Sequence, residues 1–165
     1  MPPPDAYIGL YGSHSGDWRE HCARRFASWG IATFDPTDTD SWARVTDETG
    51  DQLQDLVNTL VARQHEGILG ASAVVFHLAR RWSSVGPSDP RVHAGDLTAF
   101  AARAELGFLA GAGIHTWVHI EPDVLGRNYL WALCSLYPSL RRVSSLEEAM
   151  EGARASLLAS RPPSR

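Results

Sequence analysis

A single carboxylate, Glu105, lies in the middle of a helical stretch of small and apolar residues, Leu97–Gly113 (LTAFAARAELGFLAGAG). Its neighbours in the chain are Ala104 and Leu106, and burying a charge among such residues is unfavourable unless a partner stabilises it. A carboxylate in these surroundings can stabilise, or bond to, a substrate carbon that becomes positively charged. On the helix alone, an exposed glutamate on an ordinary surface helix is the simpler interpretation. The position of the helix in the fold decides between the two.

A second group of candidates lies in the acidic turn DPTDTDSW at 35–42, directly after an apolar run. Its carboxylates either hydrogen-bond to polar groups of a ligand, such as hydroxyls, or form ordinary turn contacts with the backbone. Its tryptophan either stacks on an aromatic ring of a ligand or packs as a core or lid residue. The candidates in this turn are Asp35, Pro36, Asp38, Asp40 and Trp42.

A third group lies in the turn GSHSGDW at 12–18, which follows the apolar and aromatic run 6–12. Gly12, Ser13 and Ser15 can offer backbone and hydroxyl donors to a sugar or phosphate, or can form a tight turn with no ligand. Tyr11 either stacks on a base or packs in the core.

Composition excludes several kinds of chemistry. All 15 basic residues are arginine, so no lysine is present for a Schiff base, for pyridoxal phosphate or for a Walker-type phosphate loop. The closest histidines, His115 and His119, lie in an expected strand, where residues i and i+4 stand well apart. We therefore expect no metal and no cofactor, and we expect His77 to be a core histidine. Cys22 and Cys134 are expected to be buried free thiols.

Length and charge suggest one soluble domain. The chain has 165 residues, 44% of them hydrophobic and 21% charged, which predicts a single domain over 6–159 between a leader (1–5) and a tail (160–165). The net charge of −4 does not favour binding to nucleic acid or to an acidic membrane. No apolar run is long enough to span a bilayer, and MPPPDAY lacks the pattern of a signal peptide. We expect a cytoplasmic protein with neither nucleic-acid nor membrane partners.

Apolar runs alternate with helical spacings along the chain. We predict strands at 6–12, 31–34, 73–78, 114–120 and 142–144, and helices at 18–29, 51–67, 97–113, 129–136 and 146–159. Because the strands are continuously apolar, this order predicts a doubly wound, mostly parallel five-stranded α/β sheet with helices on both faces, as in flavodoxin-like and Rossmann-like folds.

The candidate residues gather at one edge of this sheet. Doubly wound sheets bind ligands at the carboxyl ends of their strands, and the loops expected there are 12–17, 35–42, 79–95 and 121–128. The loop at 79–95 is longer than an ordinary connection, which is typical of a functional loop.

With its elements in this order, the chain resembles the nucleoside 2-deoxyribosyltransferase-like superfamily, and the second branch of that superfamily most closely. The resemblance covers Ile8 to Met150. Each stretch alone is a weak match, and their order and spacing make the resemblance more specific. The stretches are GLYGSHSGDWREHCARRFASWG, TFDPTDTDSW, RQHEGILGASAVVFHLAR, AFAARAELGFLAGAG, EPDVLGRNYL and VSSLEEAM.

The resemblance implies cleavage or exchange of the N-glycosidic bond of a nucleoside or nucleotide. The family nucleophile corresponds to Glu105, whose carboxylate would capture the anomeric carbon before a second base or water resolves the glycosyl-enzyme. A general acid should protonate the leaving base. The family's acid falls nearest Gln64, with Glu66 two residues further on.

Two other positions bear on the substrate and on the assembly. Arg103 either binds a phosphate or carboxylate, which would favour nucleotides, or is a solvated arginine. Asn128 is similar to a family segment that can reach a site, sometimes that of a neighbouring subunit, or it simply starts a helix. The resemblance implies a homodimer or larger homo-oligomer. Since Gln64 and Ser72 replace family acids, a non-catalytic nucleotide-binding or regulatory module is the alternative.

Overall fold

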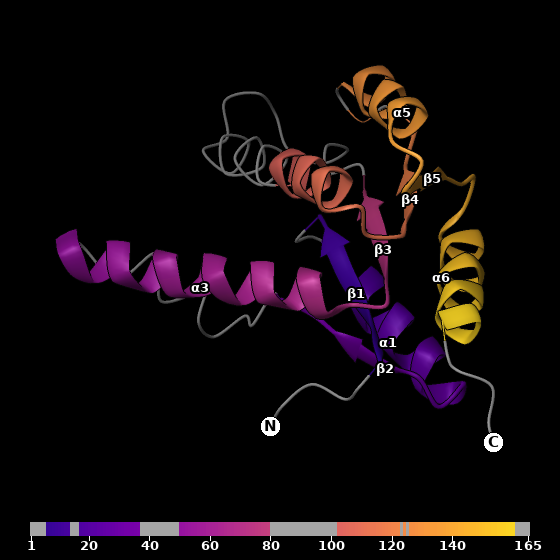
Figure 1. Ribbon diagram of the computed structural model, residues 1–165, viewed down its shortest axis with the longest axis horizontal. Coiled ribbons are helices and arrows are strands. Elements are labelled where there is room, and N and C mark those ends of the chain that lie inside the picture. The colour runs from indigo at the N-terminus through magenta and orange to yellow at the C-terminus, as the bar shows by residue number, and fades with distance from the viewer. Residues whose placement is uncertain are drawn as a thin grey trace.

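The computed structural model describes residues 6–13, 17–36, 50–79, 102–122, 124 and 126–160. The five described strands form one sheet in the order β2-β1-β3-β4-β5, and every pair is parallel (Figure 1). The predicted fold class is therefore confirmed. The strands are β1 (Tyr7–Gly12), β2 (Ala32–Phe34), β3 (Ala73–Leu78), β4 (Thr116–Ile120) and β5 (Leu140–Arg142).

Helices cover both faces of the sheet (Figure 1). On one face lie α1 (Trp18–Ser28) and α6 (Leu146–Ser160). On the other face lie α3 (Gly50–Gly70), the helical residues 102–112 and α5 (Arg127–Leu136). The N-terminal half of α3 extends well beyond the sheet, and most of its side chains are exposed.

Each face of the sheet has its own hydrophobic core, because neighbouring residues of a strand point to opposite faces. On β1, Leu10 packs toward α1 and α6 in a cluster that includes Cys22, which we call the α1/α6 core. Tyr11 packs toward the other helices, in a cluster that we call the α3/α5 core. Cys134 packs against the latter, so each core is associated with one cysteine. Both cysteines are free, and Cys22 is buried as predicted, whereas Cys134 is only partly buried.

The last strand is displaced from its predicted position. Strand β5 ends at Arg142, whereas the sequence pattern predicted 142–144, which is wrong by two residues. Leu140 is buried and pairs with Thr116 of β4. Ser144 instead donates its backbone N–H and its hydroxyl to the Glu148 carboxylate, both at 2.7 Å, next to the start of α6. Ser144, which the pattern gave to the strand, therefore belongs to the cap of that helix.

Other predicted boundaries differ by a few residues. Helix α3 continues to Gly70 rather than ending at residue 67, and α5 begins at Arg127, two residues early, after Gly126 in the left-handed conformation (φ 76°). Strand β4 begins at Thr116 rather than at residue 114. The ranges 97–101, 37–49 and 80–96 lie outside the described residues. Among the helices described, none is both long enough and apolar enough to cross a membrane.

Candidate functional site

The candidate site lies where the order of winding reverses. From β1 the chain adds β2 on one side of the sheet, and afterwards it adds β3, β4 and β5 on the other. In a sheet of this order the connections after β1 and β3 leave toward opposite faces, and the crevice between them is where such folds bind ligands. The carboxyl ends of these two strands meet at Gly12 and His77, which are paired in register.

Close backbone contacts fix this switch point. Gly12 has a φ of 118°, and a Cβ atom at this position would lie 2.1 Å from the carbonyl oxygen of His77. Ser13 donates its backbone N–H to that same oxygen (2.8 Å), and its hydroxyl accepts a hydrogen bond from the backbone of Ala79 (2.9 Å). Glycine is therefore required at position 12 by backbone conformation and by space. The bonds of Ser13 agree with the tight-turn interpretation.

Glu105 lies beside this switch point. The helix at 102–112 buries Leu106 and Leu109 in the α3/α5 core, which brings the Glu105 carboxylate near Gly12 and Arg19. Burial raises the pKa of Glu105 to about 7, although the charge of Arg19 and a hydrogen bond from the Gly12 backbone both lower it. Within the described part of the chain, its Oε2 atom is buried and has no hydrogen-bond partner.

Arg19 joins the carboxyl ends of β1 and β2. Its side chain is 9% exposed, and its Nη2 donates to the carbonyl oxygen of Gly12 (3.1 Å). Its Nη1 donates to Asp35 Oδ1 (3.0 Å) and to the carbonyl oxygen of Leu10. Burial lowers the pKa of Arg19, and the charges of Asp35 and Glu105 oppose that shift. One guanidinium therefore interacts with two carboxylates at this edge.

Tyr11 lies beneath Glu105 as a core residue. Its ring is fully buried, and its hydroxyl donates to the backbone carbonyl of Gln64 in α3 (3.0 Å). Burial and the nearby Glu105 charge raise the pKa of this phenol, so Tyr11 stays neutral. This placement agrees with the core interpretation of Tyr11, and it anchors α3 to the strand that carries Gly12.

The structure brings together Gly12, Ser13, Asp35 and Glu105 from the predicted set, with Tyr11 below them. The two predicted acid positions differ in exposure, since Gln64 is buried on α3 and Glu66 is exposed. Of the remaining predicted residues, Pro36 is buried and follows Asp35 directly, Arg103 packs near Gly126, and Asn128 is exposed. Ser15, Asp38, Asp40 and Trp42 lie outside the described residues.

Sequence reasoning missed Arg19, which it treated only as part of a helical motif. It also missed a histidine pair on the α1/α6 side, where His77 Nδ1 and His119 Nδ1 are 2.9 Å apart and Glu121 Oε1 lies 3.7 Å from His77 Nε2. Burial lowers the pKa of His77 to about 4, which keeps this ring neutral. Side chains alternate between the two faces of β3 and β4, so a known register of these strands would have predicted that His77 and His119 lie side by side.

The site can perform acid, base or nucleophilic chemistry at a single carboxylate. It combines a buried carboxylate oxygen without a partner, a backbone N–H and a fixed guanidinium. No group of three or more His, Cys, Asp or Glu side chains in the described ranges is arranged to hold a metal ion. Comparisons with known protein families, curated proteins and solved structures gave no match to this chain.

Proposed function

We propose that this protein cleaves or exchanges the N-glycosidic bond of a nucleoside or nucleotide, with Glu105 as the nucleophile. The observation that carries the proposal is the position of the Glu105 carboxylate at the β1/β3 switch point, where its Oε2 atom is buried with no hydrogen-bond partner among the described residues. This is the place in a doubly wound sheet where a small ligand is expected. The resemblance to the deoxyribosyltransferase-like superfamily gives the same residue the same role.

The carboxylate would act on the anomeric carbon of the sugar. As the C1′–N bond breaks, its electron pair leaves with the base, and a bond forms between C1′ and a carboxylate oxygen of Glu105. A base of this kind leaves poorly as an anion, so a proton must reach its nitrogen. Water or a second base then attacks C1′ and releases Glu105, which gives hydrolysis or transfer.

Arg19 and Gly12 would position the nucleophile. The Arg19 guanidinium is fixed by the Gly12 carbonyl and Asp35, so it offers a constant positive field to the carboxylate. Asp35 is partly exposed at the end of β2 and can accept hydrogen bonds from sugar hydroxyls. Glu66 is exposed on α3 and Gln64 carries no acidic proton, so neither position supports the proton transfer strongly.

A non-catalytic nucleotide-binding module is the second candidate. Two observations favour it, namely the amide at Gln64 where the family has an acid and the pKa of about 7 at Glu105, which leaves much of this group protonated at neutral pH. A module of this kind would be stabilised by a ligand without turning it over.

The test is release of free base from a panel of nucleosides and nucleoside monophosphates, with and without a second base. We expect Glu105→Ala and Glu105→Gln to lower the rate by about 10³-fold or more while the protein stays folded. Glu151→Gln, an exposed glutamate on α6, is the matched control and should keep the parent rate.

Normal turnover by Glu105→Ala would contradict a mechanism in which Glu105 is the nucleophile. Thermal stabilisation by a nucleotide, without base release from any member of the panel, would instead favour the binding module.

A further inference from the structure

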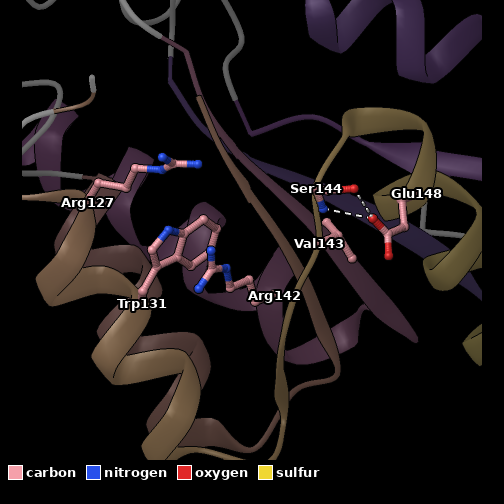
Figure 2. A pocket seen from close by; sticks show the side chains of 6 residues that line it. All are labelled: Arg127, Trp131, Arg142, Val143, Ser144 and Glu148. Atoms are coloured by element: carbon pink, nitrogen blue, oxygen red, sulfur yellow. Dashed lines mark hydrogen bonds between the residues drawn. The ribbon is translucent and has the colours of Figure 1, made fainter. Parts of the chain in front are cut away.

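A cavity lies away from Glu105, between α5, the end of β5 and the start of α6. It measures about 350 Å³, which is within the usual range for small-molecule sites. Figure 2 shows its walls, with the two arginines and the indole ring on one side and Ser144 and Glu148 on the other. The lining residues are Arg127, Trp131, Arg142, Val143, Ser144 and Glu148.

The cationic wall carries donors without partners. The guanidinium carbons of Arg142 and Arg127 lie 4.4 Å and 5.5 Å from the centroid of the Trp131 ring. Trp131 is 9% exposed, and both its Nε1 atom and the Nε atom of Arg127 are buried without a hydrogen-bond partner in the described chain. Neither arginine forms a salt bridge with any described residue. Neither guanidinium group is therefore neutralised by a described carboxylate, and both can bind an anion that enters the cavity.

A second arginine–tryptophan cluster in the chain provides a contrast. Arg25 and Arg154 each lie 4.7 Å from the ring centroid of Trp29. There, Arg154 pairs with Glu151 at 3.6 Å, and the indole nitrogen of Trp29 is not among the buried atoms that lack a hydrogen-bond partner. Stacking of arginine on tryptophan therefore does not by itself leave donors unsatisfied, and the Trp131 cluster needs another explanation.

The opposite wall carries one fixed carboxylate. Glu148 Oε2 accepts hydrogen bonds from the backbone N–H and the hydroxyl of Ser144, both at 2.7 Å. These bonds hold Glu148 beside the start of α6, where it can accept hydrogen bonds from ligand hydroxyls. The two arginines and the one glutamate leave the lining with a net positive charge.

We propose that this pocket binds a small hydroxylated phosphomonoester, with the guanidinium groups of Arg127 and Arg142 contacting its phosphate and Glu148 accepting from its hydroxyls. Two guanidinium groups offer more donors than the two oxygens of one carboxylate need, and they can serve the three terminal oxygens of a phosphomonoester. This binding site is separate from the proposed glycosidic chemistry, because none of its lining residues belongs to the Glu105 site.

The test is calorimetric titration of the full chain with inorganic phosphate and with glycerol 3-phosphate, and with glycerol as the uncharged comparison. We expect saturable binding of both phosphates and none of glycerol. Arg127→Gln and Arg142→Gln should each weaken binding by about tenfold or more, because each variant loses a charged donor to the phosphate.

Arg141→Gln is the matched control. It removes the same charge from the neighbouring exposed position of β5, which does not line the pocket, and it should change affinity by less than about twofold. Glu105→Gln should bind phosphate as the parent does, whatever its effect on base release. The proposal is overturned if phosphate does not bind saturably, if Arg141→Gln weakens binding as much as Arg142→Gln, or if Glu105→Gln abolishes it.

Discussion

Glu105 must be ionised to act as a nucleophile, whereas burial favours its protonated form. The pKa of about 7 therefore predicts the pH dependence of the reaction. We expect kcat/KM for base release to rise by about tenfold per pH unit below that pKa and to level off above it, because only the carboxylate attacks carbon. A pH–rate profile between pH 5 and 9 measures this.

The same profile separates two roles for this residue. If Glu105 delivered the proton to the leaving base, the protonated form would be active and the rate would fall as the pH rises through 7. A falling profile would therefore contradict the nucleophile and favour a general acid at the same position.

At the scale of the element, the approach of β1 to β3 depends on Gly12. We expect Gly12→Ala to lower the free energy of unfolding by about 3 kcal/mol, since the added Cβ would meet the His77 carbonyl and the positive φ is unfavourable for alanine. Gly30→Ala is the control, because Gly30 also has a positive φ (69°) but has open space around it, and its cost should be about 1 kcal/mol. Denaturant unfolding measures both, and equal costs would contradict the close contact.

The strands and helices were largely predictable because their local signals agree with the fold. Apolar runs that end at glycine or at a polar residue give β1 and β3, and helical spacing gives α1 and α6. Local signals failed for β5, because its start is set by pairing of Leu140 with β4 rather than by its own residues.

The candidate site was predictable only in part. Glu105 stands out as an isolated acid among apolar residues, and its burial needed only the helix to face the sheet. Arg19 has no such signal, because an arginine in WREH is typical of the polar face of a helix. Its burial arises because the first turn of α1 lies at the carboxyl ends of β1 and β2, where Arg19 bonds to Gly12 and Asp35, and this arrangement depends on the tertiary fold. The Arg127–Trp131–Arg142 wall depends in the same way on α5 packing beside β5.

At the scale of the whole molecule, Glu105 and His77 make stability depend on pH in opposite directions. The pKa of Glu105 is raised from 4.5 to about 7, so its contribution is full below pH 4.5 and is lost as the pH rises toward 7. The pKa of His77 is lowered from 6.5 to about 4, so its contribution is full above pH 6.5 and is lost as the pH falls toward 4.

Glu105→Gln removes one of these two dependences. We expect the variant to be more stable than the parent at pH 8 by about 2 kcal/mol, because a largely buried carboxylate is replaced by a neutral amide. The difference should shrink to about 0.4 kcal/mol at pH 4.5, where the parent group is protonated in the folded state and half protonated in the unfolded state. Urea unfolding at the two pH values measures it, and a difference independent of pH would contradict the assignment.

Each hydrophobic core is associated with one cysteine, so the opening of the α1/α6 core and of the α3/α5 core can be followed separately by thiol labelling. Burial raises the pKa of Cys22 to about 12 and that of Cys134 to about 11, so neither thiol reacts readily in the native state. Pulsed alkylation followed by mass spectrometry would report when each becomes accessible. We expect Cys134, which is half-buried on α5, to be labelled through local opening, and Cys22 only at the rate of global unfolding. The labelling rates of the two native thiols would thus report separately on the opening of the two sides of the sheet.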